Sequence, residues 1–162
     1  MVLAMIVTGE CEVDLWLKKL YVVSWLSQPC KNQLICALVH EMSEKIYNAD
    51  NIFAKILRRE IQANVIYEDA FSLAFNDIAP AAPVHVLVIP KFECISFNDF
   101  VQKADPSFVS SFFLSVQKVA KLLGLEESGY RIVANHGNDA EQTVYHFHIH
   151  LLGKKHLGKF IS

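Results

Sequence analysis

Three histidines near the end of the chain alternate with apolar residues. His146, His148 and His150 stand at every second position, and the residues around them are Tyr145, Phe147, Ile149 and Leu151. Side chains of a β-strand point to opposite faces in turn, so the alternation predicts a strand over 144–152 with an imidazole face and an apolar face. At about 3.3 Å of rise per residue, neighbouring histidines would lie about 6.6 Å apart. The apolar face must be covered, and we expect helices to cover it.

Four earlier segments also predict strands. Each is rich in β-branched and aromatic residues and is bounded by polar turns or prolines: 65–67, 71–75, 84–89 and 130–135. We expect loops at 77–83, where two prolines prevent regular pairing, and at 136–142. Short turns connect these strands, and the helices are set apart from them. This order indicates an α+β domain built on an antiparallel sheet of about five strands.

Two segments predict the main helices, at 51–60 and 106–123. Asp50 can cap the first helix, and the second begins at an Asp-Pro pair and ends at Gly124, because these residue types favour those positions. The second helix carries more apolar residues than one face can hold: Phe108, Val109, Phe112, Phe113, Val116, Val119, Leu122 and Leu123. This excess indicates either a thick core or a subunit interface, and we favour the interface.

Length and charge narrow the possible classes of protein. The 162 residues allow one domain, and 15 Lys+Arg against 17 Asp+Glu give a formal charge of −2. This balance excludes a strongly basic nucleic-acid-binding face. Four cysteines are too few for a disulfide scaffold. No stretch reaches the roughly 18 apolar residues that a membrane span needs. We therefore expect a cytoplasmic protein with neither nucleic acid nor membrane as a partner.

Residues 1–42 form an apolar extension ahead of the predicted domain at 43–162. Their first charged residue is Glu10, whereas a secretory signal needs positive charge before its apolar core. The extension could be a helix, or the natural start could lie at Met42. We favour the second alternative, because the residues after Met42 predict a complete domain on their own.

Three interpretations of the histidine row compete. The histidines could face solvent by coincidence. They could bind zinc, although three ligands along a straight strand converge poorly on one ion and no further Cys or acidic cluster stands nearby. They could instead line a phosphoester, with one nitrogen attacking phosphorus while others donate hydrogen bonds to its oxygens. A pKa near 6.5 keeps both neutral and protonated imidazole accessible at pH 7. We favour phosphate chemistry and expect no metal and no cofactor.

The segment His146–Leu152 resembles the His-x-His-x-His-x-x signature of the histidine triad (HIT) family. Four earlier segments resemble, in order, parts of its Hint-like branch: 52–56, 75–80, 82–90 and 130–135. The resemblance covers about residues 45–153. It implies an α+β homodimer, with the sheet extended across the dimer. It also implies a hydrolase or transferase that cleaves purine nucleoside phosphoramidates through a nucleotidyl-histidine intermediate.

The resemblance also implies a role for each matched position. His148 would be the nucleophile, His150 would hydrogen-bond the phosphate, and His146 would fix the imidazole network. His85 matches a fourth histidine near this group, and Asp77 matches the acid that binds the ribose hydroxyls. On local grounds alone, Asp77 could be a turn residue and His85 a buried core histidine.

Further matched positions would surround the nucleotide. Asn135, otherwise a turn cap, would contact the phosphate, and Thr143 stands where relatives usually have a Ser that touches phosphate or leaving group. Backbone amides of the 136–142 loop could donate to the phosphate as well. The remaining nucleotide-binding positions, mostly apolar walls of the base pocket, are Ile52, Phe53, Phe75, Asn76, Ile78 and Gln142.

Two departures from the family pattern affect the expected function. Many relatives carry Cys-x-x-Cys in a structural zinc site where this chain has residues 51–54, Asn-Ile-Phe-Ala, so we expect that zinc site to be absent. Glu141 takes the place of the usual Gly before Gln142, which puts turnover and leaving-group choice in doubt. Besides a phosphoramidase, a dinucleoside polyphosphate hydrolase and a nucleotide-binding regulatory protein with weak activity remain open.

Overall fold

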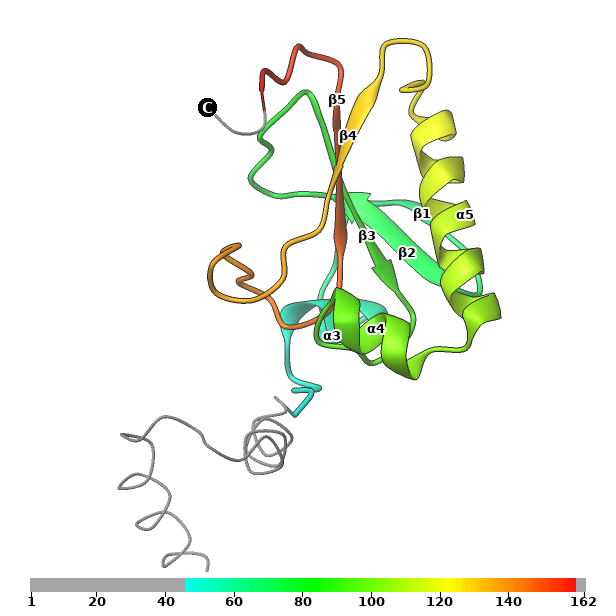
Figure 1. Ribbon diagram of the computed structural model, residues 1–162, viewed down its shortest axis with the longest axis vertical. Helices are drawn as coiled ribbons and strands as arrows, with labels where there is room; N and C mark the ends of the chain where they lie inside the picture. Colours follow the sequence, from blue (N-terminus) through cyan, green and yellow to red (C-terminus); the bar gives the residue numbers. More distant parts are fainter. Residues whose placement is uncertain (1–45, 160–162) are drawn as a thin grey trace, which may run out of the picture. The chain divides into compact units, whose positions relative to one another are not determined.

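The structure, a computed structural model, describes residues 46–159 (Figure 1). The proposed extension 1–42 and its boundary with the domain lie outside the described residues. The elements in chain order are α3 Ile52–Leu57, β1 Val65–Glu68, β2 Ser72–Asn76, β3 Val84–Pro90, α4 Phe97–Lys103, α5 Pro106–Leu122, β4 Tyr130–Val133 and β5 Ile149–Gly153.

The five strands form one sheet in the order β1-β2-β3-β5-β4, and every neighbouring pair is antiparallel. This arrangement confirms the predicted α+β class and the number of strands. Helix α5 runs along one face of the sheet (Figure 1). β4 forms one edge of the sheet, beside β5. None of the described helices is long and apolar enough to cross a membrane.

Strand periodicity divides the core into two clusters, one on each face of the sheet. Val86 and Val88 of β3 pack in the cluster that contains Phe112 and Val116 of α5. Their neighbours along β3, including Leu87, pack in the other cluster, which contains residues of α3. Burying an apolar side chain of this size contributes roughly 1.5–3 kcal/mol. Both faces of β3 are therefore covered, and the second face is the one that holds α3.

Asp69 ties the β1–β2 turn to α5. Its Oδ1 accepts hydrogen bonds from the backbone N–H groups of Phe71 and Ser72, at 2.8 Å each. Its Oδ2 accepts from the hydroxyl groups of Ser115, in α5, and Tyr67. Burial opposes ionisation, but these donors outweigh it and hold the pKa of Asp69 at about 2. The turn that the sequence predicts thus also positions the long helix.

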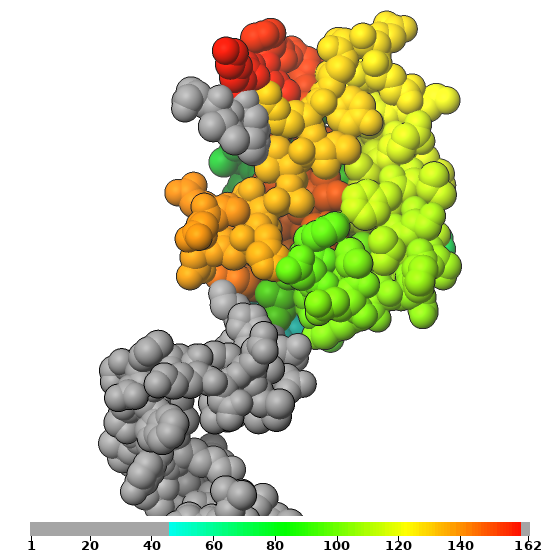
Figure 2. Space-filling view, in the orientation of Figure 1, coloured from blue at the N-terminus to red at the C-terminus, as the bar shows by residue number. Residues whose placement is uncertain are grey.

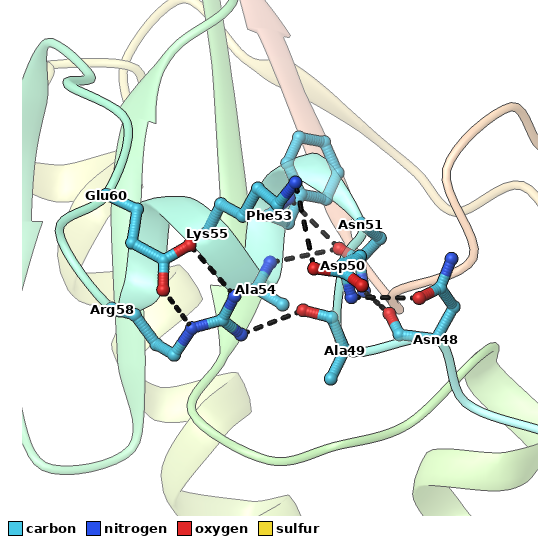
Figure 3. A network of polar contacts seen from close by, with 9 residues as sticks. All are labelled: Asn48, Ala49, Asp50, Asn51, Phe53, Ala54, Lys55, Arg58 and Glu60. Atoms are coloured by element: carbon cyan, nitrogen blue, oxygen red, sulfur yellow. Dashed lines mark hydrogen bonds and ion pairs between the residues drawn. The ribbon is translucent and has the colours of Figure 1, made fainter.

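The predicted cap of α3 is wrong by one residue. Asn51, not Asp50, is the N-cap: its side chain accepts from the backbone N–H of Phe53 at 3.0 Å and of Ala54 at 2.9 Å (Figure 3). The helix was expected to reach residue 60 but ends at Leu57. Soon after it, Arg59 takes a positive φ of 64°, which a continuing right-handed helix does not allow.

The final strand is shorter than predicted. It begins at Ile149 rather than at residue 144, so only His150 of the three histidines lies in β5. The preceding residues bond to the chain after β3 instead of to a strand: Phe147 N–H donates to the Cys94 carbonyl at 2.9 Å. The alternation of faces nevertheless persists, because Phe147 is buried in the α5 cluster and stacks on Phe100 with ring centroids 5.1 Å apart.

Helix α4 was not predicted from the sequence. Ser96 accepts from the backbone N–H of Asp99, and the Asp99 carboxylate accepts from the backbone N–H of Ile95 at 2.8 Å. This reciprocal arrangement resembles a capping box, and its Ser-x-x-Asp pattern was the available signal. The helix has only seven residues and buries a single side chain, Phe100, so it shows little helical periodicity.

The bounds of α5 agree with the sequence prediction. It begins at Pro106, and Gly124 follows its end with a φ of +62°. Four of its apolar residues are buried against the sheet: Phe112, Val116, Val119 and Ala120. Of the other apolar residues that the sequence places here, Phe108, Val109 and Leu123 pack against the core, whereas Phe113 and Leu122 are exposed by 38 and 62%. Leu114 is exposed by 57%. Figure 2 shows α5 and the edge strand β4 on the same face of the molecule.

Replacing Asn51 by Ala should lower the free energy of unfolding by about 1 kcal/mol, because two N–H groups at the start of α3 lose their acceptor. Urea unfolding measures this change. Asp50→Ala is the matched control, since the side chain of Asp50 makes an exposed ion pair with Lys55 at 3.8 Å and its removal should cost much less. An equal loss in both variants would contradict the assignment of the cap.

Candidate functional site

The histidines gather on the face of the sheet that holds α3. His85 in β3 and His150 in β5 lie on adjacent strands, where His150 is opposite Leu87. The Nε2 of His85 is 2.9 Å from the Nδ1 of His150. His148, just before β5, has its ring centroid 5.0 Å from that of His150 and 5.0 Å from that of Phe53. The structure thus brings His85 together with the triad, as the sequence predicts.

Backbone carbonyls fix the protons of the first two histidines. A carbonyl oxygen only accepts, so the nitrogen that contacts it must carry the proton. His146 Nε2 donates to the Pro90 carbonyl at 3.1 Å, and its Nδ1 accepts from the Tyr47 hydroxyl at 2.6 Å. His148 Nδ1 donates to the His146 carbonyl at 2.7 Å. The Nε2 of neutral His148 therefore holds a lone pair that is available for attack on an electrophile.

A backbone N–H fixes the tautomers of His85 and His150. Ala81 N–H donates to His85 Nδ1 at 3.1 Å, so the proton of neutral His85 lies on Nε2. That proton is donated to His150 Nδ1 at 2.9 Å, and Asp77 Oδ2 lies 3.4 Å from the same Nε2. His150 must then carry its own proton on Nε2. This Nε2 is buried and has no hydrogen-bond partner, so it is an N–H donor that lacks an acceptor.

Burial keeps the triad neutral. It is the largest cause that lowers the pKa of His146 to about 4. It also lowers the pKa of His148. For His150, burial followed by the nearness of His148 and His85 lowers the pKa to about 4. At pH 7 the three rings therefore have the neutral form that the hydrogen-bond directions require.

Within residues 46–159, Asp77, His85 and His150 form a group whose ligand atoms lie within 4.8 Å of one another. A metal ion between them would need the lone pair of His85 Nε2. The proton would then move to Nδ1, where it would face the N–H of Ala81 at 3.1 Å. Two donors cannot bond each other. The donor set therefore suits a chain of hydrogen bonds and does not fit a resident metal.

The residues predicted to bind the nucleoside divide into two sets. Asp77 lies beside His85, and its Oδ1 accepts from the backbone N–H of Ala79 at 2.8 Å. Phe53 and Phe75 are buried against each other with ring centroids 5.7 Å apart. The others lie farther out: Asn76 is exposed at the end of β2, Ile52 is 43% exposed, and Ile78 is 96% exposed.

The predicted phosphate-loop residues are less closely tied to the histidines. Gln142 is buried, and its side chain bonds the backbone: Nε2 donates to the carbonyls of Ile95 and Val144, and Oε1 accepts from Gly137 N–H. It therefore shapes the 136–142 loop from within. Thr143 is exposed and Asn135 is half-buried, and no hydrogen bond joins either of them to the described histidines.

Sequence reasoning missed two partners of the histidines. Tyr47 bonds His146 across 99 positions of the chain, and Ala81 reaches His85 through its backbone N–H. The first contact leaves no local pattern in the sequence, and the second does not depend on the side chain. The sequence did offer a signal for the Ala81 contact, because the segments 75–80 and 82–90 on either side of Ala81 both match the family.

Stability should fall as the pH drops from 7 to 4. The pKa of His146 is near 6.5 in the unfolded chain and about 4 in the fold, so the unfolded state takes up the proton first and stability is lost below pH 6.5. This residue alone should cost of the order of 3 kcal/mol by pH 4. In His146→Gln, whose amide can still donate to the Pro90 carbonyl, urea unfolding should depend less on pH. An unchanged pH dependence would contradict the assignment.

Comparisons with known proteins identify the family. The HIT domain family model matches residues 58–157. An uncharacterized HIT-like protein of Rickettsia prowazekii is 46% identical over 112 residues, which are 69% of this chain and 93% of that protein. The purine nucleoside phosphoramidase of Escherichia coli K12 is 38% identical over 113 residues, 70% of this chain and 94% of that enzyme.

Solved structures show the same fold. A histidine triad protein from Clostridium difficile has a TM-score of 0.65 and 39% identity, and the match covers 71% of this chain and 99% of that one. A HIT family hydrolase from Legionella pneumophila has a TM-score of 0.62 and 42% identity, covering 66 and 95%. The fold, the triad and these matches together show that the chain belongs to the HIT family.

Proposed function

We propose that the protein is a nucleotide-binding hydrolase that cleaves nucleoside 5′-phosphoramidates through a nucleotidyl group on His148. One observation carries the proposal: the lone pair on His148 Nε2 stands beside His150, whose buried Nε2–H has no acceptor. A phosphoryl group next to both rings would offer its phosphorus as the electrophile for His148 and an oxygen as the acceptor for His150.

The proposed reaction has two steps. His148 Nε2 attacks phosphorus, the bond to the leaving amine breaks, and the amine departs with a proton from water. The imidazole then carries a positive charge, which the Nδ1–H bond to the His146 carbonyl stabilises. His150 Nε2–H donates to a phosphoryl oxygen as charge develops there. Water next attacks phosphorus, and the bond between phosphorus and His148 Nε2 breaks. The proton that this water loses neutralises the hydroxide left by the first step, so the products are the nucleoside monophosphate and neutral His148.

The nucleoside would be held by Asp77 and by the Phe53–Phe75 cluster. A carboxylate can accept from two neighbouring ribose hydroxyls at once, and flat apolar side chains suit a purine. Thr143, Asn135 and the amides of the 136–142 loop would complete the phosphate site. The name of the relative in E. coli, a purine nucleoside phosphoramidase, supports a purine phosphoramidate as substrate.

We also propose that two copies assemble through α5 and β4. Tyr130 and Ile132 of β4 are exposed by 36 and 49%, together with the apolar residues on the outer side of α5. A second copy would cover this surface and pair with the β4 edge of the sheet, which would extend the sheet across a homodimer.

His148→Ala should lower the turnover of an adenosine phosphoramidate with a fluorogenic leaving group by about 10³-fold or more, because it removes the nucleophile. The matched control is His156→Ala, since His156 is exposed in the C-terminal segment. A metal chelator should leave the wild-type rate unchanged. Equal rates for His148→Ala and wild type would exclude His148 as the nucleophile, and inhibition by the chelator would contradict the metal-free reaction.

A nucleotide-binding protein with low turnover is the second candidate, and Glu141 favours it. This residue has a φ of +54°, a conformation that costs a residue with a Cβ roughly 1–2 kcal/mol. It also places a negative charge in the loop that precedes the histidines.

If this candidate is correct, the wild type binds adenosine monophosphate but turns over slowly, and Glu141→Gly raises kcat several-fold. Glu141→Gln separates the two causes, because it removes the charge and keeps the backbone cost. The same fluorogenic assay measures all three proteins. Wild-type turnover as fast as that of Glu141→Gly would leave only the hydrolase.

A further inference from the structure

The chain after β5 turns back onto the 77–83 loop, and Figure 1 shows this red segment beside the green loop. Lys155 Nζ donates to the Ala81 carbonyl at 2.7 Å. Farther along, Arg131 of β4 holds the same segment, donating to the Gly158 carbonyl at 2.7 Å and to the Leu157 carbonyl at 3.3 Å. The C-terminal segment is therefore attached both to the sheet and to the loop.

Ala81 is the residue through which this attachment reaches the site. Its carbonyl accepts from Lys155, while its N–H donates to His85 Nδ1. Residues 78–81 and 83 of this loop are exposed, whereas Ala82 is buried. Pro80 and Pro83 have no N–H to donate. The N–H and the carbonyl of Ala81 belong to the two peptide groups on either side of its Cα, so the two contacts hold the backbone of Ala81 from both sides.

The contacts form one continuous chain to the reacting group. Lys155 bonds Ala81, Ala81 bonds His85, and His85 bonds His150. The last two contacts set each other, because an imidazole that accepts at one nitrogen must donate from the other. The first contact acts on them by holding the backbone of Ala81. Without the Ala81 N–H, His85 could carry its proton on Nδ1, and His150 would lose the donor that keeps its own proton on Nε2.

We propose that Lys155 is a positioning residue: by holding the backbone of Ala81 at its carbonyl, it keeps the Ala81 N–H on His85 Nδ1 and so keeps His85 in the tautomer that aims the His150 Nε2–H at the phosphate. This inference rests on the proposed function for its effect on catalysis. Its structural part, the link from Lys155 to the His85 tautomer, holds whatever the substrate is.

The neighbouring lysine provides a matched control. Lys154 Nζ also donates to a backbone carbonyl, that of Gly124 beyond the end of α5. Replacing either lysine by Met removes one positive charge and one lysine–carbonyl bond from the same segment. Only Lys155 bonds the loop that reaches His85, so the two variants separate positioning from general effects of charge or of chain anchoring.

The test measures kcat and KM of the full chain with the fluorogenic adenosine phosphoramidate, and the ¹⁵N chemical shifts of the His85 ring nitrogens. We expect Lys155→Met to lower kcat by about two- to tenfold, the effect of one lost hydrogen bond, with little change in KM. Its His85 Nδ1 signal should shift toward the protonated form. Lys154→Met and the conservative Lys155→Arg should behave like the wild type in both measurements.

Two results would overturn the proposal: an unchanged His85 tautomer in Lys155→Met, whatever its rate, or equal effects of Lys154→Met on kcat and on the tautomer. If the wild type does not turn over the substrate, the proposed function fails, and the ¹⁵N measurement still decides whether Lys155 controls His85.

Discussion

The site depends on one constraint: a neutral imidazole has one nitrogen that donates and one that accepts, and the backbone around each ring decides which is which. The carbonyls of Pro90 and His146 each accept a hydrogen bond from a ring N–H, and the Ala81 N–H donates to the bare nitrogen of a third ring. Burial prevents protonation from erasing this order, because it lowers the pKa of all three triad histidines. The directions of the bonds, more than the number of histidines, give His148 and His150 their different chemistry.

The fold supplies those backbone groups by starting β5 late, at Ile149. If the strand had begun at residue 144, the His146 carbonyl would be in position to accept from the backbone of a neighbouring strand. The irregular chain before Ile149 instead leaves it free to accept from His148 Nδ1. The same segment is held by Phe147, which is buried beneath α5 and bonded to Cys94. Packing on one face of the sheet thus fixes the histidine rings on the other face.

The sequence predicted what periodicity and turn chemistry determine. Five strands, the ends of α5, and the meeting of His85 and Asp77 with the triad all follow from such patterns or from the family resemblance. It did not predict where β5 begins, because alternation of faces continues through the irregular residues up to Phe147. The Asn51 cap was missed because two adjacent residues, Asp50 and Asn51, are both good caps. The contacts of Tyr47, Ala81 and Lys155 join distant segments and leave no local pattern.

The unpaired N–H of His150 shows how stability and function are balanced here. A buried donor without an acceptor costs about 1–3 kcal/mol, and a single change of tautomer would move that proton to Nδ1, against the N–H of His85. The proton of His150 therefore stays on Nε2 although it has no acceptor there. The tautomer of His150 is fixed by the N–H of His85, and the tautomer of His85 is fixed by the N–H of Ala81. In the proposed reaction, a phosphoryl oxygen would accept from this N–H, so binding energy would be gained at the atom where charge develops.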